Sequence, residues 1–510
     1  MTDGSRNVQY FDGKDLPPLI DAEESFDEPL NWSVRIWHFV NDKKNLGFIL
    51  LVVLYVAWFI HLSLLQYYTY GDPPFDLAIF DQGMWLISHF HIPFVTVMGR
   101  NLFGDHTSFV LLLVAPFYRL FPEPQGILVL QTLLLAAPAI PIYWLARKSI
   151  KSTWIATALV ATYLLSPLIQ QGNLDQFHPE AFQVFFIAVA IYAAIERKSV
   201  LLIVMVVLAL MVKEDAALLI IPLAVWVTLR RDRRLGLSII AGSVLWAMVA
   251  NLLIIPSLLG TSSIYSGRIP FGGVSGTIST LFHHPGQFFS YLGSQGRLFY
   301  LWQLGSTVGF ALLFSPEIAL IGSLVVAENM ISNDGYMHQI LYQYSIVLAP
   351  VLVLGTLYAI SKQTHLWRRN ALTIIALTGA LTSCALWGYA PFSANSVNPG
   401  TVSTSSIKAL NGLEDRLPPN AVVAAWYPLV AHIDQRTQVY VWPTPFSASN
   451  WGLLNDTGVR LRVASQVQYL LLPTQLSSPN DAAVFKQISG GYRLVQSGGG
   501  FGLYEKKSSS

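Results

Sequence analysis

The chain has 510 residues, of which 53% are hydrophobic and only 12% are charged, and its mean hydropathy is +0.48. Soluble proteins carry about 25% charged residues, so this composition excludes a soluble enzyme and indicates a polytopic membrane protein. The single cysteine, Cys384, lies in an apolar run, which excludes a disulfide framework and a cysteine-based metal site. With a net charge of only +2, no nucleic-acid partner is expected.

The N-terminal segment is polar. Residues 1–30 hold eight acidic residues against Arg6 and Lys14, a net charge of −6, which is typical of a disordered tail. Residues 32–39 have the composition of an interfacial amphipathic helix. We therefore expect residues 1–41 to form a cytoplasmic acidic tail and an interfacial helix. No cleavable signal peptide is visible, so the first apolar run should act as an uncleaved signal-anchor.

Eleven apolar stretches follow that are candidates for transmembrane helices. They cover approximately residues 46–65, 125–146, 153–171, 179–195, 199–212, 216–229, 236–259, 298–314, 316–331, 345–360 and 371–389. The positive-inside rule places the basic clusters between them in the cytoplasm. These clusters are Lys43-Lys44, Arg147-Lys148 with Lys151, Arg197-Lys198, Arg230-Arg231 with Arg233-Arg234, and Lys362 with Arg368-Arg369.

One short apolar segment does not fit the alternation of sides. If residues 108–121 crossed the membrane, Lys44 and Arg147 would lie on opposite sides. The segment has 14 residues, and a comfortable span needs about 20, so we predict a helix that dips in from outside and does not cross. The alternative is that it crosses together with a second piece around residues 77–90. The first reading gives 11 transmembrane helices, with the N-terminus in the cytoplasm.

Most Asp, Glu and His residues near the membrane then fall on the extracytoplasmic side. They are Asp76, Asp81, Asp105, His106, Asp175, His178, Glu214, Asp215 and Glu328, with Lys213 among them. Lys213 lies 15 residues after Lys198, roughly 22 Å along a helix, which is less than the hydrocarbon thickness of about 30 Å. It should therefore lie below the outer membrane surface. A charged set at this depth usually lines a functional cavity, although a polar turn with snorkelling side chains is the alternative.

The segment after residue 393 changes character. Helical spacing of apolar residues over 407–417 and short apolar runs at 421–426, 438–442, 468–472, 492–495 and 502–505 predict a small α/β domain outside the membrane. It carries neither a phosphate-binding loop nor a nucleophile motif, which favours a cap or docking module. The Gly/Ser-rich loop 260–297 is long enough to act as an external lid.

Several short motifs carry a resemblance that spans roughly residues 75–504. They are Phe75–Gln82 (FDLAIFDQ), Gly104–Ser108 (GDHTS), Asp175–Glu180 (DQFHPE), Val212–Asp215 (VKED) and Tyr342–Ser345 (YQYS). Together they resemble a large family of uncharacterised prokaryotic polytopic membrane proteins, known only as a domain of unknown function. That family in turn looks like the GT-C glycosyltransferases, which use lipid-phosphate-linked sugars. The resemblance implies an all-α polytopic membrane domain over residues 42–392 and an extracytoplasmic α/β domain over 393–510.

The resemblance also suggests roles for single residues. In GT-C enzymes an Asp in the first external loop is catalytic or binds metal, and Asp76 occupies that place. Asp105-His106 fits the motif near the donor phosphate, although the Lys-Pro-Pro that relatives often carry there is absent. Asp76 and Asp81 are roughly 140° apart around a helix, so both cannot reach one atom. We predict Asp76 as the catalytic base and Asp81 as an orienting or capping carboxylate, and either could be only an N-cap.

The remaining candidates bind substrate or metal. His106, Lys213, Arg268 and Arg297 are the cations available for a phosphate, with Glu214 and Tyr344 as further substrate contacts. Asp105, His178 and Glu180 could hold a divalent cation, without a diagnostic ligand spacing. For Lys213 the alternative is a structural salt bridge to Glu214 or Asp215.

Taken with the resemblance, these features predict a plasma-membrane glycosyltransferase. It would move a sugar from a polyprenyl-phosphate donor to a glycan, lipid or protein acceptor outside the cytoplasm. One rival is a transporter or flippase of a lipid-linked sugar, but no internal repeat is visible. A non-catalytic membrane scaffold is the other, and only the buried carboxylates argue against it.

Overall fold

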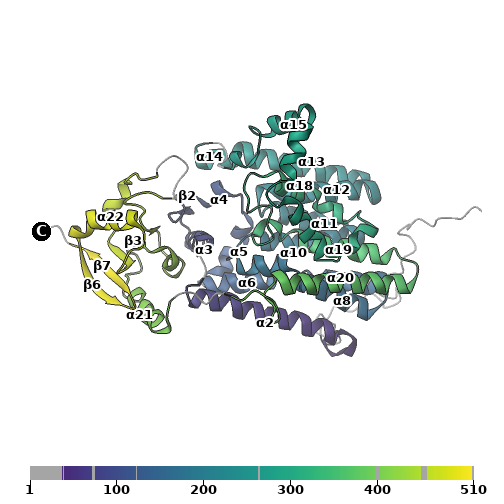
Figure 1. The fold of residues 1–510 in the computed structure, drawn as a ribbon, viewed down its shortest axis with the longest axis horizontal. Coiled ribbons are helices and arrows are strands. Elements are labelled where there is room, and N and C mark those ends of the chain that lie inside the picture. Colours follow the sequence, from purple (N-terminus) through teal and green to yellow (C-terminus); the bar gives the residue numbers. More distant parts are fainter. Residues whose placement is uncertain are drawn as a thin grey trace, which may run out of the picture.

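The structure, a computed structural model, describes residue 37 and residues 39–71, 75–121, 123–261, 265–397, 402–449 and 457–507. The predicted acidic tail and most of the predicted interfacial helix lie outside the described residues. A helical part, α2 to α20, carries a smaller C-terminal region with a sheet at one of its ends (Figure 1).

The helical part contains both long and short apolar helices. Among the described residues, five helical segments are long and apolar enough to cross a membrane, or six if the pair α8–α9, bent by 41°, is one span. The helices of this part are α2 (Leu46–Tyr68), α6 (Pro124–Ala136), α7 (Ala139–Ile150), α8 (Thr153–Leu164), α9 (Pro167–Leu174), α10 (Glu180–Ile195), α11 (Ser199–Leu210), α12 (Ala217–Arg230), α13 (Arg233–Val249), α14 (Ile255–Leu259), α19 (Leu348–Ser361) and α20 (Leu366–Trp387).

Shorter elements connect these helices. They are α3 (Phe75–Ser88), β1 (Phe94–Val95), β2 (Arg100–Asn101), α4 (Leu102–Asp105), α5 (Val110–Tyr118), α15 (Val274–His283), α16 (Pro285–Leu292), α17 (Arg297–Ser306) and α18 (Ser323–Ile331). The segment expected to act as a lid thus contains two helices, α15 and α16. With nine residues α5 is only about 13 Å long, and that this segment does not cross the membrane stays a prediction.

One predicted span is wrong as a continuous helix. Residues 298–314 divide into α17 and a short 3-10 turn at Ala311–Phe314. The break occurs because Gly309 and Phe310 both have φ of +57°, a left-handed conformation that cannot continue an α-helix. The expected total of 11 spans stays a prediction.

Local sequence signals explain where several helices begin. Pro124, Pro167 and Pro285 stand at the first positions of α6, α9 and α16, where a missing N–H breaks no bond. Asp232 caps α13, since its carboxylate accepts from the backbone N–H groups of Arg234 and Leu235 at 2.8 and 3.0 Å. These signals fix the helix starts independently of the membrane.

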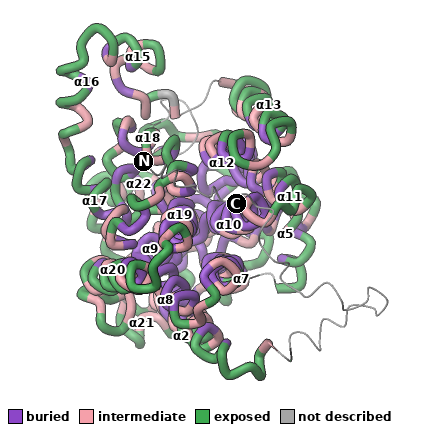
Figure 2. Tube along the Cα trace, turned by 90° about the vertical axis from the view of Figure 1, so that its right-hand side faces the viewer, coloured by how far each residue is buried: buried purple, intermediate pink, exposed green. Residues whose placement is uncertain are grey.

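The core of the helical part is built around α10. Its residues are almost all buried, and it packs against α6, α7, α11, α12 and α19. In Figure 2, α10 lies in the buried centre, whereas α13, α15, α16 and α20 lie at the exposed rim. Because exposed Leu, Val and Phe side chains cover this rim, the outer surface is apolar, as a lipid environment requires.

The C-terminal region confirms the predicted α/β pattern. Its five-stranded sheet has the order β4-β3-β5-β7-β6, with β3 parallel to β4 and β5 and with β7 antiparallel to β5 and β6. The elements are α21 (Thr404–Glu414), β3 (Val423–Ala425), β4 (Val439–Val441), β5 (Tyr469–Pro473), α22 (Pro479–Ile488), β6 (Tyr492–Gly498) and β7 (Phe501–Lys506).

This region is tied to the start of the helical part. The Thr96 hydroxyl donates to the carbonyl oxygen of Val439 at 2.7 Å, and Gln82 Nε2 donates to the carbonyl oxygen of Arg436 at 3.1 Å. The His432 ring stacks between Tyr67 and Tyr70, with ring centroids 4.2 Å from each. Buried residues of both parts belong to one continuous core, so the C-terminal region is docked on α2 and α3.

Candidate active site

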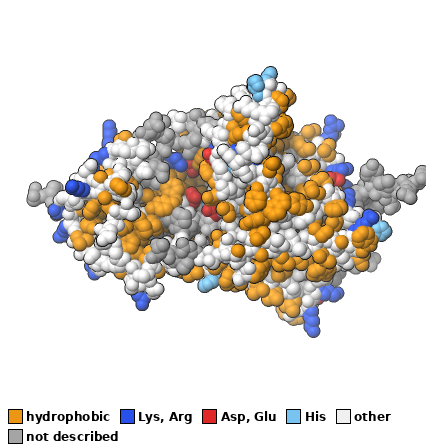
Figure 3. Space-filling model, viewed as in Figure 1, with side chains coloured by type: hydrophobic (Ala, Val, Ile, Leu, Met, Phe, Trp, Pro, Cys, Tyr) orange, Lys and Arg blue, Asp and Glu red, His pale blue; other side chains and the backbone are white. Residues whose placement is uncertain are grey.

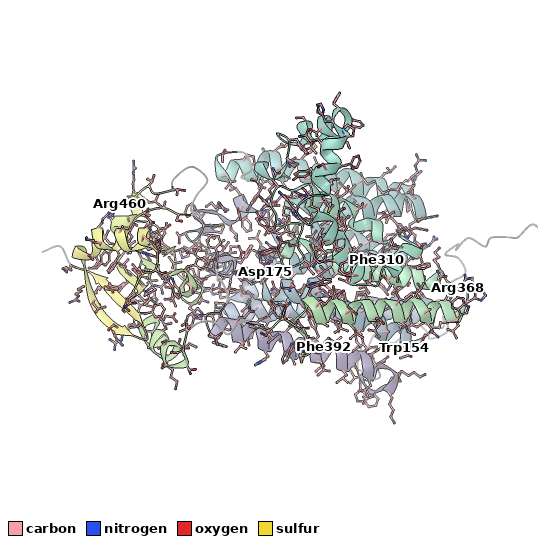
Figure 4. All side chains as sticks on the ribbon, viewed as in Figure 1. Trp154, Asp175, Phe310, Arg368, Phe392 and Arg460 are labelled. Atoms are coloured by element: carbon pink, nitrogen blue, oxygen red, sulfur yellow. The ribbon has the colours of Figure 1, made fainter. Side chains whose placement is uncertain are left out.

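The predicted acidic and histidine residues gather where the helical part faces the C-terminal region. Asp175 lies at this junction in Figure 4, whereas Trp154 and Arg368 lie near the opposite end of the helices. A group of Asp and Glu side chains is visible in the hollow between the two parts (Figure 3). Three segments distant in sequence converge here, namely the segment around α3 and α4, the loop before α10 and the turn between α11 and α12.

Six side chains form a closed ring at this end, which we call the cation–tyrosine ring. Its members are Lys213, Tyr344, Arg268, Tyr265, His106 and Glu214. Lys213 Nζ lies 5.6 Å from the centroid of the Tyr344 ring, and the Arg268 guanidinium lies 5.6 Å from Tyr344 and 4.0 Å from Tyr265. The Tyr265 and His106 rings are stacked at 5.0 Å. His106 Nδ1 is 2.7 Å from Glu214 Oε1, which closes the ring beside Lys213.

His106 and Glu214 each shift the pKa of the other. Burial alone would lower the pKa of His106, but the Glu214 carboxylate outweighs burial and raises it. Burial likewise opposes ionisation of Glu214, yet His106 holds the pKa of that carboxyl at about 2. The Glu214 carboxylate also accepts from the backbone N–H of Thr107 at 3.2 Å. Each group of the pair therefore favours the charged form of the other.

Lys213 is buried and paired on two sides. Its Nζ lies 2.9 Å from Glu180 Oε1 and 3.4 Å from Asp215 Oδ2. A polar cavity of about 30 Å³, room for one or two waters, is lined by Glu180, Lys213, Asp215, Glu328 and Tyr344, among others. An ammonium has three N–H donors, so Lys213 can bind both carboxylates and still donate into this cavity.

A second pair lies beside the ring. His178 Nε2 is 3.4 Å from Asp76 Oδ2; the His178 side chain is buried, whereas Asp76 is 42% exposed. Neither ring nitrogen of His178 has a hydrogen-bond partner among the described residues. Burial would lower the pKa of His178, but Asp76 and the neighbouring carboxylates raise it to about 9. The exposed carboxylate thus has a buried cation behind it and an open side toward solvent.

Asp81 lies on the same helix as Asp76 but in different surroundings. It is 0% exposed, accepts from the Tyr118 hydroxyl at 2.7 Å and lies 3.3 Å from Gln435 Nε2. Asp434, also fully buried, shares a hydrogen bond with it. Burial raises the pKa of Asp81 to about 6 against the opposing hydrogen bonds, and it raises that of Asp434 well above its usual range. The two buried carboxyls disfavour each other's ionisation, and they lie where α3 meets the C-terminal region.

The sequence singled out Asp81 but not the residues around it, Tyr118, Asp434 and Gln435. Gln435 is 354 positions from Asp81, and Tyr118 looks like an ordinary apolar-helix residue. A run of three polar residues, Asp434-Gln435-Arg436, between two predicted strands was the one available signal.

Arg297 is not part of the gathered set. It is fully buried, and its guanidinium donates to the carbonyl oxygens of Met330 at 2.7 Å and Ser332 at 2.9 Å. These bonds tie the start of α17 to the end of α18, so the side chain has a structural environment and presents no face to the ring.

The three expected metal ligands have separate partners. Asp105 pairs with Arg100 at 3.0 Å and accepts from the Tyr265 hydroxyl, His178 pairs with Asp76, and Glu180 pairs with Lys213. Across the described residues no group of three or more His, Cys, Asp or Glu side chains could hold a metal ion. The donor sets of these three residues do not fit a divalent cation.

An apolar groove runs between α11 and α13 and ends at this site. It has a volume of about 450 Å³ and is lined by residues such as Val206, Leu210, Ile239, Ser243 and Trp246. The Ser243 hydroxyl and the Trp246 indole N–H are buried there without hydrogen-bond partners among the described residues. Met211 lines the groove at the end of α11 and stands only two residues before Lys213. Its carbonyl oxygen accepts a hydrogen bond from the backbone N–H of Val110.

The fold and its apolar helices define a multi-pass membrane protein with a small C-terminal sheet region. The chain belongs to the DUF2079 family, described as a predicted membrane protein, whose model matches residues 67–503. This confirms the family to which the sequence motifs pointed.

Two solved structures are similar in fold. They are ArnT from Cupriavidus metallidurans bound to undecaprenyl phosphate and the same protein in the apo state, with TM-scores of 0.48 and 0.47. Each is 12% identical in sequence, and each match covers 89% of this chain and 98% of the ArnT chain. At this distance the likeness carries no argument about substrate or mechanism. No curated protein matches the chain in sequence.

Proposed function

We propose that this protein is a GT-C-like glycosyltransferase of the plasma membrane. It moves a sugar from a polyprenyl-phosphate donor to a glycan, lipid or protein acceptor outside the cytoplasm. The observation that carries the proposal is the pairing of the half-exposed Asp76 with the buried His178, beside a ring of three cations at the end of an apolar groove. Undecaprenyl phosphate, the lipid bound by ArnT of Cupriavidus metallidurans, belongs to the class of the proposed leaving lipid.

Asp76 is the proposed base. Its carboxylate takes the proton of the acceptor hydroxyl while the acceptor oxygen forms a bond to the anomeric carbon of the sugar. The bond between that carbon and the phosphate oxygen breaks, and the polyprenyl phosphate leaves with the electron pair. Exposure supports Asp76 over Asp81, because a base must touch the acceptor and Asp81 is 0% exposed. His178 stabilises the base from behind.

The cation–tyrosine ring is the proposed phosphate site. Lys213, Arg268 and His106 supply the positive charge that a departing phosphate needs, in surroundings that exclude bulk water. Tyr344 and Glu214 hold these cations in position. The groove between α11 and α13 is the proposed place of the first isoprene units, since it is apolar and ends beside Lys213.

The orientation follows from charge. Arg368, from one of the five basic clusters, lies at the end of the helical part away from the C-terminal region (Figure 4), where further Lys and Arg side chains are visible (Figure 3). With the basic clusters in the cytoplasm, the candidate site and the C-terminal region lie outside, and the N-terminus lies inside.

The decisive test is sugar transfer by the full chain in nanodiscs with a panel of polyprenyl-phosphate sugars. We expect Asp76→Asn to lower transfer at least about a hundredfold while donor binding is kept, because the amide has nearly the same size but is not a base. Asp481→Asn is a matched control, since Asp481 also lies in the first turn of a helix, α22, away from the site. Near-normal transfer by Asp76→Asn would overturn the assignment, and movement of the lipid across the bilayer without transfer would favour a flippase.

A further inference from the structure

Two cavities lie at the end of the helices opposite the candidate active site, on either side of Arg231. The first, about 230 Å³, is lined by Glu196, Trp226, Leu229, Arg230, Arg231 and Lys362, among others. The second, about 200 Å³, is lined by Arg197, Ser199, Arg231 and Asp232, among others. Arg231 follows the last residue of α12 and is the residue common to both linings.

The acidic residues around these cavities are already engaged. Glu196 forms an ion pair with Lys148, and Glu317 pairs with Arg230 at 3.1 Å. Asp232 caps α13 with hydrogen bonds from two backbone N–H groups. Each nearby carboxylate therefore has a partner other than Arg231.

Arg231 itself interacts with Glu196 only from beyond ion-pair distance, and that carboxylate is already paired with Lys148. Within the described part of the chain it forms no ion pair, and its Nε is buried without a hydrogen-bond partner. Its guanidinium lies 5.1 Å from the centroid of the Trp226 ring, which holds it in the cavity wall. Burial, and next the charge of Arg197, lower the pKa of Arg231 below its usual value. A guanidinium placed beside another cation, with a buried unmet donor, is suited to an anion.

The mouth of the first cavity indicates what kind of anion. Leu229, in its wall, is 74% exposed, and Val225, one turn earlier on α12, is 42% exposed. Both lie on an apolar helix, so this rim faces lipid, and an acyl chain could lie along it. Ser149 and Ser361 also line the cavity and supply hydroxyl groups at the level of the basic loops.

We propose that these two cavities form a headgroup site for an anionic phospholipid, in which Arg231 binds the phosphate. The site lies in the leaflet next to the basic loops, which the positive-inside rule places in the cytoplasm. It is independent of the proposed transfer reaction, because it lies at the other end of the helices and uses none of the same residues.

The test is lipid retention by the purified full chain in detergent, measured by native mass spectrometry after exposure to phosphatidylglycerol, cardiolipin or phosphatidylcholine. We expect Arg231→Gln to weaken binding of the two anionic lipids about tenfold or more, the effect of one charge-assisted contact. Arg234, at the start of α13, lines neither cavity, so Arg234→Gln removes an equal charge nearby and should change binding less than about twofold.

Several outcomes would overturn the proposal. Equal retention of phosphatidylcholine and phosphatidylglycerol by the unmodified protein would do so without any variant. Equal losses in Arg231→Gln and Arg234→Gln would indicate general surface charge. Inorganic phosphate that displaces the lipid at millimolar concentration would indicate a site for a soluble anion. Arg231→Lys, which keeps the charge but loses the planar stack on Trp226, should give an intermediate loss and serves if Arg231→Gln does not fold.

Discussion

Asp76 and Asp81 lie five positions apart on α3, yet their surroundings differ in almost every respect. Asp76 is 42% exposed and has one ionic partner, His178. Asp81 is 0% exposed and lies among Tyr118, Gln435 and Asp434. The first carboxylate is open to a substrate, and the second joins the helical part to the C-terminal region. Residue type and position on a helix therefore do not assign a role, because the packing of a distant segment decides which carboxylate stays exposed to solvent.

The largest effect is expected when the charge of each carboxylate is removed in turn. Asp81→Asn should change sugar transfer by less than about threefold, whereas Asp76→Asn should lower it at least about a hundredfold. The reason is that Asp81 is buried away from any substrate, whereas an amide at position 76 cannot act as a base. Steady-state transfer by both variants in nanodiscs is the measurement. A hundredfold loss in Asp81→Asn with an unchanged melting temperature would reverse the two assignments.

The phosphate-binding role of the ring is tested by Lys213→Met. Loss of a buried charge-assisted contact of about 2 kcal/mol should lower kcat/KM roughly thirtyfold and weaken donor binding as well. Lys408→Met on the exposed face of α21 is the control. Because Glu180 and Asp215 lose their cation, the melting temperature is measured alongside, and Lys213→Arg should recover part of the binding. Donor binding that stays unchanged in a folded Lys213→Met protein would contradict the assignment.

The Asp81 cluster should make stability depend on pH. The folded-state pKa of Asp81 is raised from 3.8 to about 6, so its contribution is fully present below about pH 4 and is lost as pH rises through about 6. We expect the apparent Tm to fall between about pH 4 and pH 7, with a change on the order of 1 to 2 kcal/mol. The stability contributions of His106 and His178 are also lost as pH rises, since the folded-state pKa values of both histidines are raised.

Asp434→Asn separates the cluster from these histidines. It removes the like-charged partner of Asp81 and leaves the histidines unchanged, so the fall in Tm should become shallower. Thermal unfolding in detergent at several pH values, followed by intrinsic fluorescence, gives both slopes. Equal slopes in the two proteins would mean that the carboxyl pair does not control stability.

The smallest effects are expected from two tyrosine substitutions, one beside each carboxylate cluster. Tyr118→Phe removes the hydrogen bond to Asp81 and should lower stability by about 1 kcal/mol without changing donor binding. Tyr265→Phe removes the hydrogen bond to Asp105 but keeps the stacked ring, and it should affect donor binding more than stability. The melting temperature and the donor affinity of each variant are compared, and the reverse pattern would join the two clusters into one.

Much of the candidate site was predictable from position alone. Because charges near hydrocarbon are costly, residues such as Lys213 and Glu214 between two apolar helices had to share partners, and the structure places them with Glu180 and His106. The five strands of the C-terminal region followed equally well from short apolar runs between turn residues. The expected helix over 298–314 failed because hydropathy does not register two left-handed residues in succession.

The sequence by itself determined that this is a multi-pass membrane protein, which end of it carries the carboxylates and which carries the basic loops. Those features depend on hydrophobicity and charge along the chain, which decide for each segment separately whether and in which direction it inserts in the bilayer. Only the tertiary structure decided that Asp81 meets Asp434, that Arg297 is sealed against backbone oxygens, and that Arg231 faces a cavity. These outcomes depend on contacts between segments up to hundreds of residues apart, and no local pattern records which buried polar groups will satisfy one another.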